Sequence, residues 1–462
     1  MPEILRRTKP LSVNPLKASA TLGASLAFLG LRRAMPLMHG SQGCTAFGKV
    51  FFVRHFREPI PLQTTAMDHV ATVMSADENV VEALSTLCAK SAPDLIGLAT
   101  TGLAETQGSD VQRLIRRFRS EYPQFARVAV VPVATPDFSG SLETGFAAAV
   151  EATLATLLPH TRRAGLRARQ VNVLANASLT PGDLEAIRAW CEAFGLAPVI
   201  LPDLGDSLDG HLVEAGHTPL TLGGTPVEDI ATMGESAATL VIGASVERAA
   251  DLLRERSGVP DHRFDHLMGL DACDRFTATL AAIAGVPVPA GVERARAQLQ
   301  DALVDAHFMT GFLRVAVAAE ADLLAGMQGL LAGCGAEIVS AVCPTAAPVL
   351  RRLPLARIHV GDLQDLEREA RAHAAQLVIG SAHAVQGAAR LGLPILRAGF
   401  PVYDRLGAGA RAWVGYRAAR DALFEIANLI LEHHHGPAPY RSFLREPEPA
   451  RAQAHTGVVV RH

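Results

Sequence analysis

The chain has 462 residues, of which 49% are hydrophobic and 19% are charged. One hydrophobic core rarely grows beyond about 250 to 300 residues, so a single small module is excluded, and the hydrophobic content excludes disorder over most of the length. The 43 basic and 46 acidic residues leave a net charge of −3, so no global field attracts the protein to nucleic acid or to anionic lipid. We expect about three domains.

Membrane and disulfide signals are missing from the sequence. It has no run of eighteen consecutive apolar residues, which a membrane-spanning helix would need, and its N-terminal segment has no signal-peptide pattern. The six cysteines are too sparse for a disulfide scaffold and form no C-x-x-C pair. These features favour a soluble protein of the reducing cytoplasm.

Helical and strand patterns alternate in the first third of the chain. Residues 80–89 have an amphipathic helical pattern, and residues 95–99 follow as a buried strand. Residues 111–119 then predict a helix and residues 127–133 a strand. This order indicates a Rossmann-like unit.

The clearest β-α-β unit lies in the middle third. Residues 171–174 are strand-like, Thr180 offers an N-cap oxygen, and Pro181 occupies the first helical position. Gly195 ends the helix, and residues 197–201 form the next strand.

The same pattern continues in the last third. Residues 312–319 and 337–342 predict strands on either side of a helix, with later strands at 376–380 and 394–396, a helix at 382–391 and a returning helical segment at 402–432. The sequence therefore predicts an α/β protein of three Rossmann-like domains, with mostly parallel sheets flanked by helices. Its expected divisions are residues 1–165, 166–310 and 311–435, followed by a loose tail at 436–462.

Nucleotide and hydrolase motifs are absent. No phosphate loop and no G-x-G-x-x-G after a strand occur, so Gly407 and Gly409 are interpreted as a loop. No G-x-S-x-G elbow occurs either, and Ser245 is interpreted as part of an ordinary strand end. The spacing of His262 and His266 could place both rings on one helical face, but without an H-E-x-x-H glutamate a surface or packing role is favoured.

The other histidines of interest lie near Cys44 and near residue 433. His39 and His55 lie beside the Cys44 segment, and we expect both to make structural hydrogen bonds. The histidines at 433–435 predict adventitious metal binding at most.

The cysteines divide into two groups. Five are expected to be small buried hydrophobes, namely Cys88, Cys191, Cys273, Cys334 and Cys343. Cys44 instead lies among three glycines, in G-S-Q-G-C-T-A-F-G at residues 40–48, which predicts a ligand loop whose N–H groups approach a bulky anionic group. Spacing alone leaves a structural thiol in a glycine-rich turn as an open alternative.

If Cys44 is a cluster ligand, the other ligands come from another polypeptide. An iron–sulfur cubane usually takes four protein ligands, and no cysteine near Cys44 in the sequence can supply the rest.

Residues 40–48 and 54–67 resemble the nitrogenase component-1 family, and most closely its members that assemble the iron–molybdenum cofactor. Shorter matching segments lie at 14–17, 100–105, 263–270, 305–309 and 399–405. In the catalytic β-subunit of that family, three cysteines help to hold the P-cluster. Here Ser19 and Gly102 occupy two of those positions, and only Cys44 remains.

The resemblance implies a role in cofactor assembly. The chain would form a heterotetramer with two NifE subunits and would give one ligand, Cys44, to a [4Fe-4S] cluster shared with NifE. The iron–molybdenum cofactor precursor would arrive from NifB and be held transiently, chiefly in NifE. Molybdenum and homocitrate would be added with the nitrogenase iron protein, before transfer to the catalytic component.

On this interpretation the chain is a scaffold subunit without independent catalytic activity, although its family is one of oxidoreductases. Two alternatives stay open. One is a catalytic β-type subunit of a nitrogenase or of a related reductase. The other is a sugar-nucleotide transferase, because such enzymes also pair Rossmann-like domains.

Overall fold

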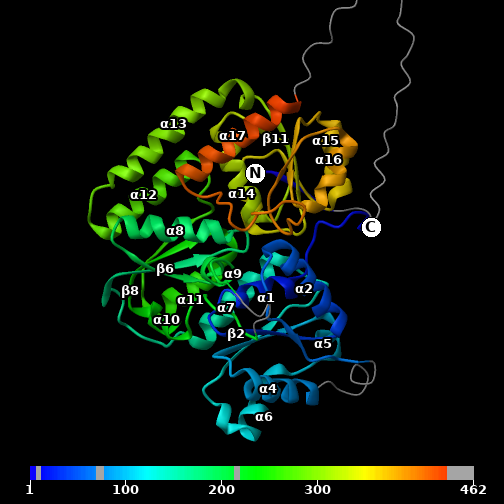
Figure 1. Ribbon diagram of the computed structural model, residues 1–462, viewed down its shortest axis with the longest axis vertical. Helices are drawn as coiled ribbons and strands as arrows, with labels where there is room; N and C mark the ends of the chain where they lie inside the picture. The colour runs from blue at the N-terminus through cyan, green and yellow to red at the C-terminus, as the bar shows by residue number, and fades with distance from the viewer. Residues whose placement is uncertain (7–11, 69–76, 213–218, 434–462) are drawn as a thin grey trace, which may run out of the picture.

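The computed structural model describes residues 1–6, 12–68, 77–212 and 219–433. Three separate sheets, each flanked by helices, form the body of the protein (Figure 1). Every strand pair within these sheets is parallel. The predicted α/β class, with parallel sheets flanked by helices, is therefore confirmed. We call each sheet together with the helices around it a layer.

The first sheet has the strand order β3-β2-β4-β5. Its strands are β2 (Ala34–His39), β3 (Gln63–Thr64), β4 (Leu95–Thr100) and β5 (Ala129–Ala134). Both β2 and β4 are buried along their whole length, as expected for parallel strands covered on both faces. The helices around this sheet are α1 (Ala20–Leu29), α2 (Gln42–Phe56), α4 (Asp77–Ser91), α5 (Gly102–Gln107), α6 (Val111–Glu121) and α7 (Leu142–Leu157).

Helices α1 and α7 approach each other closely because glycines meet at their contact. A Cβ on Gly23 would lie 1.8 Å from Leu142 O, and a Cβ on Gly145 would lie 1.8 Å from Ala20 O. No larger residue fits at either position, so these two glycines determine how α1 lies against the sheet.

The second sheet has the order β7-β6-β8-β9. Its strands are β6 (Arg167–Ala175), β7 (Ala197–Leu201), β8 (Ser236–Ile242) and β9 (Asp261–Phe264). The helices around it are α8 (Pro181–Ala193), α9 (Leu204–Leu208), α10 (Val227–Thr232), α11 (Glu247–Ser257), α12 (Leu270–Ala284) and α13 (Ala290–Thr310). The predicted cap of α8 is confirmed, because the Thr180 hydroxyl accepts from Asp183 N at 3.0 Å.

The third sheet has the order β1-β12-β11-β10-β13-β14. Its strands are β1 (Glu3–Arg6), β10 (Arg314–Ala318), β11 (Glu337–Cys343), β12 (Arg357–Val360), β13 (Leu377–Gly380) and β14 (Ile395–Arg397). The helices are α14 (Ala321–Gly333), α15 (Leu363–Ala372), α16 (Val385–Leu391) and α17 (Tyr416–His433). Strand β1 comes from the N-terminus and pairs with β12, so the first residues join this third sheet.

The helix expected over residues 402–432 is shorter than predicted. Only α17 is helical, and residues 402–415 form an irregular connection. Gly407 and Gly415 adopt positive φ angles of 75° and 91° there, which are incompatible with a continuing α-helix. Helix α17 packs on α12 and α13, next to which it lies in Figure 1. The predicted tail at 436–462 lies outside the described residues.

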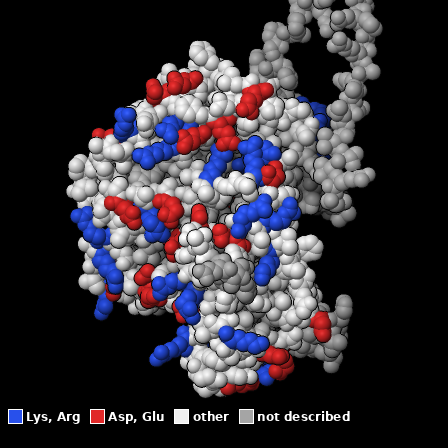
Figure 2. All heavy atoms as spheres, in the orientation of Figure 1, with Lys and Arg blue, Asp and Glu red and all other residues white. Residues whose placement is uncertain are grey.

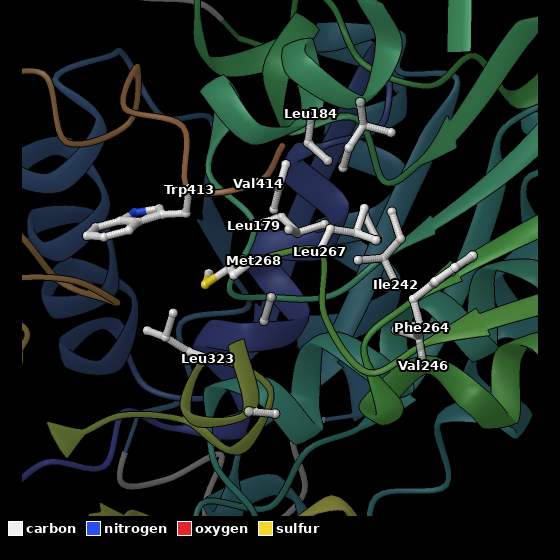
Figure 3. Close-up of a cluster of buried hydrophobic side chains, with 14 of the residues drawn as sticks. Leu179, Leu184, Ile242, Val246, Phe264, Leu267, Met268, Leu323, Trp413 and Val414 are labelled. Atoms are coloured by element: carbon white, nitrogen blue, oxygen red, sulfur yellow. The ribbon is translucent and has the colours of Figure 1, made fainter. Parts of the chain in front are cut away.

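Apolar side chains from helices and connections around different sheets meet in a shared core. Figure 3 shows Leu179, Met268, Leu323 and Trp413 coming together from separate elements, and all four are buried. This packing joins the second and third layers into one body. Among the described helices, none combines the length and the apolar composition needed to cross a bilayer.

Candidate functional site

Cys44 lies in the first turn of α2, immediately after β2. The side chain of the N-cap residue Ser41 makes no capping hydrogen bond, and its Oγ lies 3.4 Å from Cys44 Sγ. Of the six cysteines, all of them described, only Cys44 is exposed.

The predicted ligand loop is therefore wrong in its local structure, although the thiol is accessible. None of the three glycines adopts a positive φ. A Cβ on Gly40 would lie 2.5 Å from Thr101 Oγ1, and a Cβ on Gly48 would lie 2.7 Å from Leu22 Cδ2. These two glycines allow close packing, whereas a Cβ on Gly43 would meet nothing within 4 Å. The chain thus leaves open space beside the thiol.

The two positions that lack a cysteine also start helices. Ser19 is the N-cap of α1, and its Oγ accepts from Leu22 N at 3.3 Å. Gly102 begins α5, and its N–H donates to Asp137 Oδ2 at 3.3 Å. These polar contacts occupy both positions with hydrogen bonds internal to the chain.

Asp137 accepts hydrogen bonds from residues in the first turns of both helices, at one edge of the first sheet. Its Oδ1 accepts from Thr21 Oγ1 at 3.1 Å, and its carbonyl oxygen accepts from Lys17 Nζ at 3.2 Å. Strands β2, β4 and β5 are parallel neighbours and end just before Cys44, Gly102 and Asp137. The three segments therefore meet at the carboxyl edge of the sheet, where α/β proteins bind ligands.

His39 is the last residue of β2, next to this edge of the sheet. Its Nδ1 lies 2.9 Å from Thr65 Oγ1 and its Nε2 lies 3.2 Å from Ser109 Oγ. Burial lowers the pKa of His39 to about 4, against a smaller opposing effect of Asp77, so the ring is neutral near pH 7. The expected hydrogen-bonding role is confirmed.

Exposed apolar side chains lie on α2 and in the segments that follow β4 and β5. On α2, the side chains of Phe47, Val50 and Val53 are 71%, 51% and 39% exposed, and their spacing of three residues places them along one side of the helix. Leu103 and Phe138 follow Gly102 and Asp137 and are also exposed. We call these five residues the Cys44 face. An apolar area of this kind is typical of a protein–protein contact.

The other candidate residues have structural positions. His262 lies in β9 and His266 follows it, so the helical face considered for this pair does not form. His266 instead accepts from Met268 N at 3.3 Å, and burial lowers its pKa. His433 ends α17, with Nδ1 2.9 Å from Leu429 O; the two following histidines lie outside the described residues.

Five cysteines are buried as predicted. Burial raises the pKa of Cys88 to about 11 and that of Cys191 to about 12, and it raises the pKa of Cys343 well above the usual range. These five thiols are held neutral and away from solvent, which leaves Cys44 as the one accessible thiol.

The donor set fits one corner of a shared cluster and no complete metal site. Within the described ranges, no group of three or more His, Cys, Asp or Glu side chains is arranged to hold a metal ion. Next to Cys44, Thr45 Oγ1 is buried and has no hydrogen-bond partner among the described residues. One thiolate at an open, apolar edge matches a cluster whose remaining ligands lie in a second chain.

The sequence did not point to a second group of buried polar residues. Glu143 and Asp322 are buried and Glu320 is half-buried where the three layers meet, although Glu143 is far from the other two in the sequence. The available signal was that Glu320 and Asp322 directly follow strand β10, at the carboxyl edge of the third sheet. On the face that Figure 2 shows, basic and acidic side chains are interspersed.

Known proteins resemble this chain over nearly its whole length. Residues 19–431 match the family described as nitrogenase component 1 type oxidoreductase. The nitrogenase iron-molybdenum cofactor biosynthesis protein NifN of Klebsiella pneumoniae is 48% identical over 446 residues, covering 96% of this chain and 97% of that protein. The protein of the same name from Bradyrhizobium diazoefficiens is 46% identical over 427 residues, covering 92% and 91%.

A solved structure has the same architecture. The chain titled nitrogenase Cp1 at pH 6.5 superposes with a TM-score of 0.87 and 28% identity. The superposition covers 92% of this chain and 94% of that one, so the arrangement of all three layers is shared.

Proposed function

The chain belongs to the nitrogenase component 1 family, and from that membership we propose that it is one subunit of the scaffold on which the iron–molybdenum cofactor is assembled. Relatives of nearly equal length that are 46–48% identical carry a name that states this biosynthetic role. The proposed subunit has no catalytic activity of its own and works in the reducing cytoplasm, where an exposed thiol persists.

Cys44 is proposed to ligate an interface [4Fe-4S] cluster, with the other three ligands supplied by the partner NifE. The single observation that carries this assignment is that Cys44 is the one exposed thiol of six. When bound, the cluster would supply electron transfer. The chain would supply one thiolate, and the unpaired N–H groups of the first turn of α2 would be available to cluster sulfides.

The Cys44 face is proposed to pack against NifE in an assembly of two copies of each chain. Burying its exposed apolar side chains would remove water from around the cluster. The precursor would be delivered by NifB, be held chiefly in NifE, be matured with the nitrogenase iron protein, and pass to the catalytic component.

A catalytic β-type subunit is the second candidate, favoured by the superposition on a nitrogenase chain. The residue types at two positions argue against it, because Ser19 and Gly102 have no thiolate with which to hold a P-cluster. The sugar-nucleotide transferase has no support from the family match.

Anaerobic coexpression with NifE tests the proposal. Replacement of Cys44 by Ser should lower the iron and sulfide content of the purified complex and change the electron paramagnetic resonance of the interface cluster. Cys88→Ala is the matched control, because Cys88 is a buried thiol in α4. Equal cluster content in the Cys44 and Cys88 variants would contradict the ligand assignment.

A further inference from the structure

A cavity of about 370 Å³ lies beside the buried carboxyl residues, and all three layers contribute to its wall. Glu143 comes from α7 of the first layer, Ser245 follows β8 of the second, and Asp322 lies at the start of α14 in the third. The volume falls within the range of ligand pockets, about 300 to 1,000 Å³. The cavity is therefore large enough for a small molecule.

The Asp322 carboxylate is held in one position at this wall. Its Oδ1 accepts from Ala244 N at 3.1 Å, and its Oδ2 accepts from Ser245 N and Oγ at 3.3 and 2.6 Å. A Cβ on Gly243, whose φ is 101°, would lie 2.5 Å from Asp322 Oδ2. A glycine at the end of β8 is thus needed for this close approach.

Glu143 has an oxygen that the protein leaves without a partner. The residue is 3% exposed, and its Oε2 accepts from Asp322 N at 2.8 Å. Its Oε1 makes no hydrogen bond within the described residues, although Glu143 lines the cavity. Because a buried polar atom without a partner is costly, this oxygen is suited to accept from a donor that enters the cavity.

The two buried carboxyls also have no basic partner. The more exposed charges of the wall are already paired, Arg248 with Glu151 at 3.1 Å and Glu247 with Arg352 at 3.0 Å. Arg248 is the one basic residue among the described residues that line the cavity. The buried carboxyls form no ion pair with a lysine or arginine in the described part of the chain. Once ionised, they would need a cation from outside to balance their charge.

The rest of the wall determines what kind of cation fits. It is mostly apolar and is formed by Ala147 and Ala148 of α7 and by residues 346–349. A hydrated metal ion gains nothing from such a surface, whereas an alkyl chain does. A primary ammonium group also has three N–H donors and a positive charge, which match the unpartnered oxygen and the missing counterion.

We propose that this cavity binds a primary alkylammonium ion, the protonated form of an aliphatic amine. The ammonium group donates to Glu143 Oε1 and pairs with the Asp322 carboxylate, while the alkyl chain lies against the alanines. The site uses no residue of the Cys44 face, so it goes beyond the assembly role proposed above.

Calorimetric titration of the full chain at pH 8 with butylammonium, tetramethylammonium, potassium and butanol tests the proposal. Burial raises the pKa of Asp322 to about 6, so this carboxyl is ionised at that pH. We expect butylammonium to bind most tightly. In Glu143→Gln the amide oxygen accepts from Asp322 N and an NH2 group faces the cavity. Butylammonium binding should therefore weaken by at least about tenfold, the effect of losing one charge-assisted hydrogen bond.

Glu228→Gln is the matched control, since Glu228 lies on α10 and pairs with Arg32 at the surface. It should bind butylammonium as the unmodified chain does. Circular dichroism should be unchanged in both variants.

Proton release gives a second measurement, on the unmodified chain. Burial, followed by Asp322 and Glu320, raises the pKa of Glu143 well above its usual range. The other titratable groups that act on this cluster are Cys343 and Asp265. A bound positive charge should ionise a buried carboxyl, so butylammonium binding at pH 7 should release protons to the buffer. The binding enthalpy should then differ between buffers with different ionisation enthalpies.

Absence of butylammonium binding up to about 10 mM would overturn the proposal, as would equal affinities in the Glu143 and Glu228 variants. Butanol binding as tight as that of butylammonium would overturn the ionic pairing, and equally tight tetramethylammonium would overturn the N–H donation. Equally tight potassium would overturn the alkyl assignment. A binding enthalpy that is the same in all buffers would overturn the contact with the buried carboxyls. None of these results depends on the cluster, whose iron content is measured separately.

Discussion

Replacement of Glu143 by Gln should change how the stability of the chain depends on pH. Glu143, at the start of α7, is buried beside Glu320 and Asp322. Its Oε2 accepts from Asp322 N at 2.8 Å, and Asp322 accepts from Ala244 N and from Ser245 N and Oγ at 3.1, 3.3 and 2.6 Å. These bonds connect the three layers at one point.

The magnitude follows from the cost of ionising buried carboxyls. Burial raises the pKa of Asp322 from 3.8 to about 6 and that of Glu320 from 4.5 to about 7. At about 1.4 kcal/mol per pKa unit, ionising Asp322 in the folded chain costs about 3 kcal/mol. The folded chain keeps these protons to higher pH than the unfolded chain does. The free energy of unfolding therefore falls as the pH rises from about 4 to about 7.

Gln keeps an oxygen that can accept from Asp322 N but removes one titratable carboxyl from the cluster. Between pH 5.5 and 8, the free energy of unfolding should fall in both proteins. The fall should be smaller in the Glu143→Gln variant by at least about 1.4 kcal/mol, which is equivalent to one pKa unit. Urea denaturation at several pH values measures this, with the first unfolding transition as the readout.

Glu151→Gln is the control on the same helix, because Glu151 pairs with Arg248 near the surface. It should follow the pH profile of the unmodified chain. An unchanged pH slope in the Glu143 variant would refute the electrostatic account of the junction.

Three further predictions address the first layer and its exposed edge. Burial lowers the pKa of His39 from 6.5 to about 4. The free energy of unfolding of the unmodified chain should therefore fall by up to about 3 kcal/mol as the pH falls through that range. His39→Gln should remove that loss in acid denaturation curves. Gly97→Ala would place a Cβ 2.2 Å from the Phe28 ring and should cost about 1–3 kcal/mol in urea melts; unchanged stability would refute the packing. Phe47→Asp should reduce copurification of NifE, whereas Leu166→Asp, at a similarly exposed position, should not. Equal yields would exclude the Cys44 face as the contact.

Elements with strong local signals were predicted from the sequence. Helix α8 has its capping box and an N-terminal proline, and its bounds agree with the prediction within two residues. The layered class followed from apolar runs alternating with helical patterns. The connection at 402–415 was misjudged because its apolar residues, such as Val402 and Trp413, are buried by tertiary contacts outside any helix.

Helix α2 shows why the candidate site was only partly predictable. Thr45, Gly48 and Phe52 face the protein interior, while Phe47 and Val50 are exposed. With apolar residues on both sides, the helix lacks the one-sided pattern that identifies a surface helix. The glycines then suggested a turn, whereas the segment forms the start of a helix.

The carboxyl cluster could not be predicted, because Glu143 and Asp322 come together only through the packing of separate layers. No local spacing records such a contact, and an acidic residue after a strand is more often exposed than buried.

An anaerobic structure of the complex with NifE would test the central claim most directly. The account predicts cluster density bonded to Cys44 Sγ at the contact between the two chains, with three further ligands from the partner and with Phe47 buried beside it. A complex in which Cys44 lies away from the partner, or in which all four cluster ligands come from NifE, would contradict it.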